Sequence, residues 1–341
     1  MNEEVVRFAA VAIRQPRGSG ADPATLTAAY RIASLGLALA YGLALALLPV
    51  DAFLDRDNYL VYATNGEAIL ASYSALGWLN ILANEPLWLL GNITLSHVLA
   101  PEQILRLFVF LPATTVAYLV LRTGPRQFFW LLLFLLLPQV IKNHIVHLRQ
   151  GVAVAVFLAA WNVKSPVWRW ALMLSTTLIH ASFFFVLGLL ALTGFLKKIR
   201  LATDLRLLLV VAAGMAVGIG LGWLAKIFGA RQGQEYQFVA AQISGVGFLF
   251  WCTVLALFVM QGKRFTRENA FAVGAITFYL GTYFFVEVTA RIFESALLIV
   301  LLAGLRLTGW RRVAFLSLIV TYGAMMYWLR LDDPWLGFGV T

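Results

Sequence analysis

A dense polar segment interrupts the apolar sequence between residues 142 and 150. It reads Lys-Asn-His-Ile-Val-His-Leu-Arg-Gln and lies between two strongly apolar runs. Arg149 and Gln150 stand where the next helix is expected to begin, and the free N–H groups of a helix start attract anions. The guanidinium of Arg149 adds a fork that matches phosphate oxygens. The segment is either a polar loop between helices or an anion site formed by Lys142, His147, Arg149 and Gln150.

A second candidate is His180, which lies in the apolar segment Leu-Ile-His-Ala-Ser-Phe. A single histidine among apolar residues is often a hydrogen-bonded structural residue. Its imidazole can also accept a proton during catalysis or donate to a phosphate. Both interpretations of His180 stay open from the sequence.

The third candidate combines one arginine with two carboxylates, Glu287, Arg291 and Glu294. Their spacings of four and three residues put all three on one face of a helix, provided that the helix is continuous. The face is either a structural salt bridge or a catalytic arginine held by carboxylates.

Acidic and aromatic residues form the fourth region, which includes Asp57, Tyr59 and Glu85. Such side chains bind sugar hydroxyls, a cation or only water. Within the sequence, no His/Cys/Asp/Glu spacing resembles a zinc site, and the phosphate-binding glycine loop, GxSxG and the dinucleotide fingerprint are absent. We therefore expect neither a metal nor a cofactor.

The elements that must position these residues are membrane helices. The chain of 341 residues is 61% hydrophobic and only 12% charged, against about 25% charged in soluble domains. The mean hydropathy of +0.84 excludes a disordered chain, a soluble nucleic-acid module and an ordinary cytosolic enzyme. The net charge of +10 is attributed to cytoplasmic loops that face an anionic leaflet rather than to nucleic-acid binding.

The apolar runs predict an all-α, polytopic integral membrane protein with about 9–11 transmembrane helices. Residues 1–31 are expected in the cytoplasm, 32–330 form one transmembrane domain, and the tail 331–341 is periplasmic. Residues 51–101 are expected outside as amphipathic or re-entrant helices, although 81–99 could span instead. The runs lie at roughly 32–50, 104–121, 127–141, 150–163, 167–196, 205–228, 239–261, 269–286, 292–305 and 313–329.

The run 167–196 is too long for one upright span, since about 20 residues cross the hydrocarbon core. It is either a broken hairpin with His180 near its tip or one tilted helix. The positive-inside rule does not separate these two topologies. The mismatch in length favours the break.

The order of the motifs resembles the EpsG-like branch of the Wzy polysaccharide polymerases, over roughly residues 50–305. The motifs are Asp57-x-Tyr59, Glu85-Pro86-Leu87, Leu148-Arg149-Gln150-Gly151, His180-x-Ser182 and Arg291 opening a late helix. These bacterial inner-membrane proteins extend O-antigen, capsule or exopolysaccharide chains. The resemblance implies a fold related to the metal-independent end of the GT-C class of glycosyltransferases.

The resemblance also implies a reaction at the periplasmic face of the inner membrane. A polyprenyl-pyrophosphate-linked oligosaccharide would be transferred onto a second lipid-linked unit, and a chain-length regulator would be a further partner. A diphosphate leaving group needs cations, for which Arg149, Arg291 and Lys142 are available. His180, His147, Glu287 and Glu294 are the candidate bases.

Two other classes of function remain open from the sequence. A flippase or transporter of lipid-linked sugars usually shows two related halves, and no such repeat is visible. An integral membrane O-acyltransferase usually carries an early arginine and histidine motif, and none is evident before His97.

Overall fold

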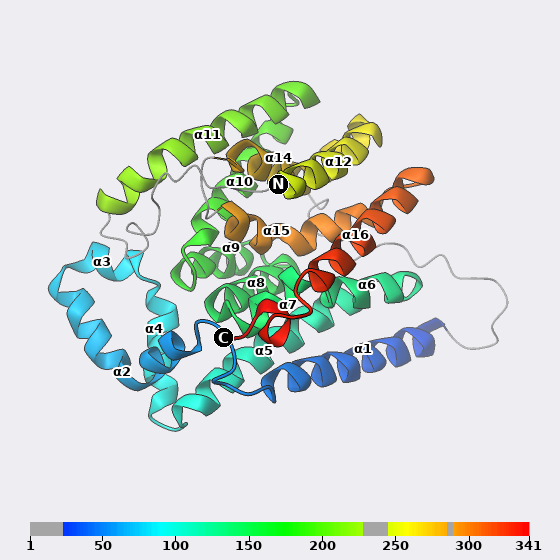
Figure 1. Cartoon of the computed structure of the whole chain (residues 1–341). Helices are drawn as coiled ribbons and strands as arrows, with labels where there is room; N and C mark the ends of the chain where they lie inside the picture. Colours follow the sequence, from blue (N-terminus) through cyan, green and yellow to red (C-terminus); the bar gives the residue numbers. More distant parts are fainter. Residues whose placement is uncertain (1–22, 228–244, 285–288, 341) are drawn as a thin grey trace. The chain divides into compact units, whose positions relative to one another are not determined.

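The computed structural model describes residues 23–227, 245–284 and 289–340, without the side chains of 23–27 and 221–227. Within these residues the secondary structure is helical, as predicted (Figure 1). The only β-structure in the described part of the chain is one isolated bridge between Phe53 and Gly339. The helices are α1 (Pro23–Ala46), α2 (Arg56–Ala75), α3 (Trp78–Ala83), α4 (Pro86–Ser96), α5 (Pro101–Leu121), α6 (Phe128–Leu135), α7 (Pro138–Ile145), α8 (Leu148–Trp161), α9 (Pro166–Ser175), α10 (Ser182–Lys198), α11 (Thr203–Ile227), α12 (Val246–Met260), α13 (Lys263–Glu268), α14 (Ala270–Thr282), α15 (Thr289–Gly304) and α16 (Trp310–Trp328).

Several of these helices have the length and composition of a membrane span. Among the described residues, three segments qualify: Ala28–Ala46, Pro101–Leu121 and Thr203–Gly220. A fourth is possible if α6 and α7 form one span, bent by 64° at the break before Pro138. The shorter helices α8, α12 and α14 are also apolar. The multi-pass membrane character that the sequence predicts is thus present.

The run 167–196 is not one helix. α9 ends at Ser175, a 3₁₀ turn covers Thr176–Leu178, and α10 begins at Ser182. His180 lies in the break, as expected from the length of the run. Whether either half enters or crosses a membrane stays a prediction.

The chain divides into two compact units. Unit 1 comprises 1–69, 87–180 and 331–341, and unit 2 comprises 70–86 and 181–330. The prediction of one continuous transmembrane domain over 32–330 stays untested.

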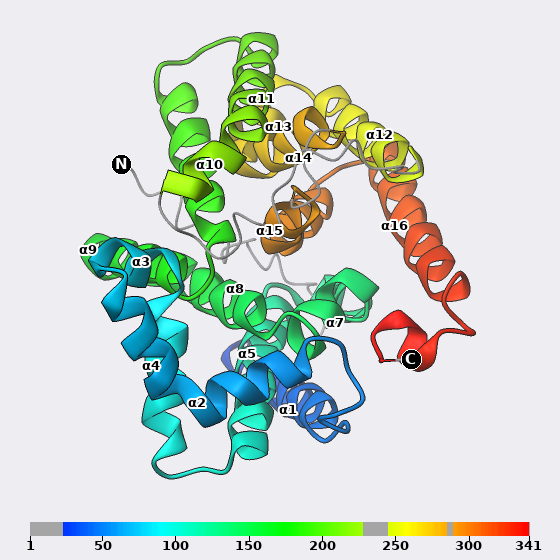
Figure 2. The ribbon, with the colours of Figure 1, turned by 60° about the vertical axis from the view of Figure 1, so that its left-hand side comes forward.

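Unit 1 is built on α1, α5, α7 and α8, which pack together in Figure 2. Gly42 allows the close approach of α1 to α5, because a Cβ there would lie 2.9 Å from the Phe110 carbonyl oxygen. Arg106 donates to the carbonyl oxygen of Ala46 at 2.6 Å and so closes the end of α1. A cation is favourable there because the last carbonyls of a helix have no intrahelical partner.

The contact between α7 and α8 depends on Gly151. A Cβ built on Gly151 would overlap the carbonyl oxygen of Asn143 and lie 3.1 Å from its carbonyl carbon. Both atoms belong to the backbone and cannot rotate away. The glycine of the Arg-Gln-Gly motif therefore lets the first turn of α8 lie directly on α7.

In unit 2, α14 contacts α10, α11, α12 and α15. Gly214 of α11 brings that helix close to α14, since a Cβ would be 3.1 Å from Thr282. An aromatic cluster joins the inner faces: Phe293 stacks on Tyr279 at 4.6 Å and meets Trp251 edge-on at 4.5 Å. Small residues and interlocking rings supply the close packing that membrane helices need.

We expect Gly151→Ala to lower the thermal unfolding midpoint of the protein in detergent, by an amount that corresponds to about 1–3 kcal/mol. The matched control is Gly188→Ala in α10, where nothing lies within 4 Å of the added Cβ. That control should be neutral or slightly stabilising, because alanine favours a helix over glycine by about 0.5–1 kcal/mol. Equal midpoints for the two variants would contradict the close approach of α7 and α8.

Candidate functional site

The polar segment 142–150 forms the turn between α7 and α8 in unit 1. The backbone N–H groups of Val146 and His147 both donate to the carbonyl oxygen of Lys142, at 2.9 Å. His147 occupies the N-cap position of α8, and its carbonyl oxygen accepts from the N–H of Gly151 at 2.9 Å. Lys142 is half-buried near the end of α7. The segment is therefore an ordered turn that joins two packed helices.

Arg149 lies over two aromatic rings of α2. Its guanidinium carbon is 5.8 Å from the ring centroid of Tyr59 and also 5.8 Å from that of Tyr62. Both tyrosines are buried. The aromatic faces attract the cation and hold its planar fork. The predicted residues Tyr59 and Arg149 thus meet in one place.

His147 pairs with Asp55, which the motifs in the sequence do not include. The imidazole Nδ1 is 3.6 Å from a carboxylate oxygen of Asp55. Asp55 has a positive φ of 64°, and its carbonyl oxygen accepts from Tyr59 at 3.2 Å in the first turn of α2. Asp57, the residue that the motif emphasised, is exposed. A carboxylate beside Nδ1 orients an imidazole and favours its protonated form.

Three further polar side chains are buried beside this turn, namely Asn143, His144 and Gln150. Within the described residues, neither Asn143 Oδ1 nor His144 Nδ1 has a hydrogen-bond partner. The His144 ring meets Tyr41 edge-on at 6.3 Å. Buried polar atoms without partners cost roughly 1–3 kcal/mol each. A cluster of them is uncommon in a purely structural core.

Arg56 is a further cation that the sequence analysis missed. It begins α2, is only 3% exposed, and lies over the ring of Phe53 at 5.6 Å. Its Nε has no acceptor among the described residues. Burial lowers the pKa of Arg56 to about 10, so the side chain is still charged at neutral pH. In the sequence it stands between two aspartates and looks like part of a solvated loop. Only its place in the fold reveals the burial.

In unit 2, Glu85 closes the start of α10. Its carboxylate accepts from the N–H of Ala181 at 3.1 Å, and the residue is 3% exposed with a φ of 59°. A carboxylate is favourable at a helix N-terminus. Ser182, of the His-x-Ser motif, contacts Ser295 of α15 through their hydroxyls at 3.2 Å. Glu85 and Ser182 therefore fix the start of α10, and sugar binding by Glu85 stays a prediction.

The remaining predicted residues are distributed over both units. His180 is buried at the end of the second segment of unit 1. In unit 2, Arg291 is exposed on α15 and Glu294 is half-buried one turn later. Glu287 lies outside the described residues. Arg149 and Arg291 belong to different units, so their joint action stays a prediction.

No group of three or more His, Cys, Asp or Glu side chains suited to a metal ion occurs among the residues that the structure describes. Lys142, Arg149 and the buried Arg56 bring three positive charges to the start of α2 and the α7–α8 turn. Two carboxylates lie at the start of α2: Asp55 is paired with His147, and Asp57 is exposed. This surplus suits an anionic ligand.

Comparison of the chain with protein-family models, with curated proteins and with solved structures finds no match.

Proposed function

We propose that the protein is a polysaccharide polymerase that transfers a polyprenyl-pyrophosphate-linked glycan onto a second lipid-linked repeat unit, without a metal. The proposal places the N-terminus in the cytoplasm of a bacterium and the reaction at the periplasmic face of the inner membrane. It retains about 9–11 membrane helices in a GT-C-like arrangement. The observation that carries it is the α7–α8 turn, where Arg149 is held over Tyr59 and Tyr62 and His147 meets Asp55.

The proposed step needs a base and an anion-binding group, and the turn offers both. A sugar hydroxyl of the acceptor attacks the anomeric carbon of the donor, and a new C–O bond forms there. The bond between that carbon and the diphosphate oxygen breaks, and its electron pair leaves with the diphosphate. His147, oriented through Nδ1 by Asp55, takes the proton of the hydroxyl. Arg149 stabilises the negative charge that develops on the leaving group.

Arg56 supports a second anionic subsite next to the first. Tyr59 packs against Arg149, and Arg56 lies three residues before it at the start of α2. The buried Nε of Arg56 has no acceptor among the described residues, and a buried charged donor left in this way destabilises a protein unless a ligand supplies the acceptor. A polymerase that joins two lipid diphosphates would provide two such anions. In this proposal Arg149 binds one diphosphate and Arg56 binds the other.

We expect Arg149→Lys to lose most of the polymer, by about tenfold or more, because lysine is a point charge without the fork. The same loss is expected for Arg291→Lys, and the double variant should be little worse if both serve one leaving group. The measurement is the ladder of products on a gel, from producing cells that carry only the variant. Purified protein with lipid-linked repeat units gives the same readout.

The matched control for Arg149 is Arg122→Lys. Arg122 lies over the ring of Tyr118 at 5.4 Å in the same unit and donates to Asn162 at an exposed site. It should retain normal polymer. Equal products from Arg149→Lys and the wild type would remove the proposed role of Arg149. Movement of lipid-linked units across the membrane without any laddered product would show a flippase instead.

For Arg56 we expect opposite effects on stability and on function. Arg56→Met removes a buried charge whose Nε lacks an acceptor among the described residues. The free energy of unfolding of the ligand-free protein, measured by thermal unfolding, should therefore rise by about 1 kcal/mol or more. The same variant should raise the KM for the lipid-linked substrate. Arg106→Met is the control and should lose stability, because Arg106 donates to the end of α1. A less stable Arg56→Met protein with an unchanged KM would contradict an anionic subsite at Arg56.

A further inference from the structure

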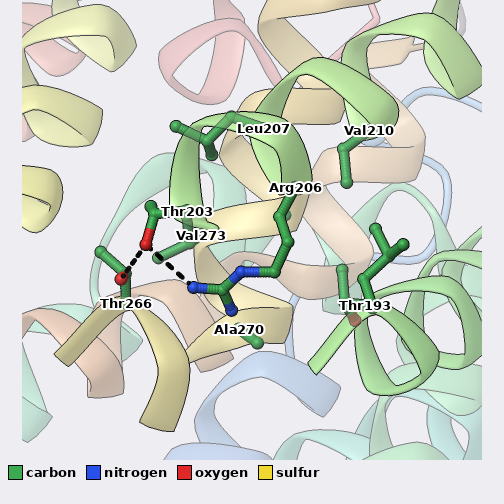
Figure 3. A pocket seen from close by; sticks show the side chains of 10 residues that line it. Thr193, Thr203, Arg206, Leu207, Val210, Thr266, Ala270 and Val273 are labelled. Carbon is green, nitrogen blue, oxygen red and sulfur yellow. Dashed lines mark hydrogen bonds between the residues drawn. The ribbon is translucent and has the colours of Figure 1, made fainter. Parts of the chain in front are cut away.

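Unit 2 contains a pocket remote in sequence from the residues of the α7–α8 turn. It lies among α10, α11, α13 and α14 and is a small hollow, open to the surroundings, with a cavity volume of about 20 Å³. Figure 3 shows Arg206 between the polar and apolar parts of its wall. The polar part comes from Thr203 and Thr266, and the apolar part includes Leu207, Val210 and Val273.

Within the described residues, the guanidinium of Arg206 makes only part of the hydrogen bonds that it can donate. Its Nη2 donates to the hydroxyl of Thr203 at 3.1 Å, and that hydroxyl is 3.4 Å from the hydroxyl of Thr266 (Figure 3). Its Nε is buried and has no acceptor among the described residues. A buried donor without an acceptor costs roughly 1–3 kcal/mol, and more when it is charged. The pocket therefore holds a donor that suits an anion.

The carboxylate of the neighbouring helix α13 is already engaged. Glu268 accepts from Arg264 at 2.8 Å through one oxygen and from Arg306 at 3.0 Å through the other. The positive charge of Arg267 also acts on Arg206. Lys197 adds a further cation at the end of α10, and Asp204 adds one negative charge in the first turn of α11. This end of unit 2 thus carries an excess of positive charge around the pocket.

The walls of the pocket continue onto a helix with a largely open apolar surface. Only 17% of the apolar segment Thr203–Gly220 of α11 is buried inside the protein. Leu205 and Leu208, on either side of Arg206, are exposed. Such a helix suits contact with acyl chains, while Arg206 and the hydroxyl of Thr203 suit a phosphate. Together these features fit a ligand with an anionic head and apolar chains.

We propose that this pocket binds the phosphate headgroup of an anionic membrane phospholipid. Arg206 and the hydroxyl of Thr203 donate to the phosphate oxygens, while the hydroxyl of Thr266 donates to the carbonyl oxygen of Lys263 at 3.1 Å and lies beside Thr203. The acyl chains lie along the apolar surface of α11. Since basic residues concentrate at the cytoplasmic leaflet, the lipid belongs to that leaflet, on the side opposite to the proposed polymerisation. The site is independent of the polymerase proposal.

The test titrates delipidated, detergent-solubilised full-length protein with short-chain phosphatidylglycerol and follows the thermal unfolding midpoint. Binding to the folded state raises the midpoint as the concentration of ligand rises. We expect Arg206→Gln to weaken this effect about tenfold or more. Lys198→Gln changes the net charge equally at an exposed position of the same region, and it should bind as the wild type does. Thr203→Val, which removes the hydroxyl beside Arg206 and keeps the shape, should weaken binding more mildly.

Parallel titrations with phosphatidylcholine and with inorganic phosphate distinguish the sources of the phosphate. Phosphatidylglycerol should bind more tightly than either. Equal effects of inorganic phosphate would show a free-anion site and overturn the assignment to a lipid. Equal binding by the wild type, Arg206→Gln and Thr203→Val would overturn the pocket as the site. If Arg206→Gln does not fold, the Thr203→Val titration alone decides, and unchanged binding there contradicts the proposal.

Discussion

The absence of a side chain at Gly151 sets the geometry on which the candidate site depends. Because no Cβ intervenes, the first turn of α8 rests on the backbone of α7 at Asn143. This contact fixes the turn that carries His147 and Arg149. It also places Arg149 where the rings of Tyr59 and Tyr62 can face its guanidinium. A larger residue at this one position would separate the two helices and disperse the cluster.

The largely apolar surroundings explain why most polar side chains of the described residues have a hydrogen-bond partner. A polar group away from water needs a partner, and most of the described ones have a local partner. Arg106 closes the end of α1, Glu85 closes the start of α10, and Ser182 meets Ser295. Two groups of exceptions lie at the proposed sites. One is the region of α2 and the α7–α8 turn, with Arg56, Asn143 and His144, and the other is the pocket at Arg206.

The sequence predicted the helical class and the multi-pass character because both follow from composition and from the length of apolar runs. The break at His180 also followed from length, since the run 167–196 exceeds one span. The bend at Pro138 splits the run 127–141 because proline lacks the backbone donor that a continuous helix uses. These features are local, so the residues themselves carry the signal.

The contacts of the site were harder to predict, because they join segments far apart in the sequence. The pattern drew attention to Asp57, whereas the carboxylate near His147 is that of Asp55, two residues earlier in the sequence. Arg56 has the sequence context of a solvated loop and is buried only through the packing of α2. The capping role of Glu85 depends on a helix that begins nearly a hundred residues later. The hydrophobic periodicity of a short stretch of sequence does not predict contacts between such distant residues.

The most direct test of the central claim, that the α7–α8 turn binds a diphosphate, is an equilibrium titration of the detergent-solubilised protein with a short-chain polyprenyl diphosphate. The uncharged polyprenol of the same length serves as the reference ligand. The account predicts that the diphosphate binds more tightly than the polyprenol. It also predicts that Arg149→Lys weakens this binding about tenfold or more, while Arg122→Lys leaves it unchanged. Equal affinity for the two ligands, or diphosphate binding unaffected by Arg149→Lys, would contradict it.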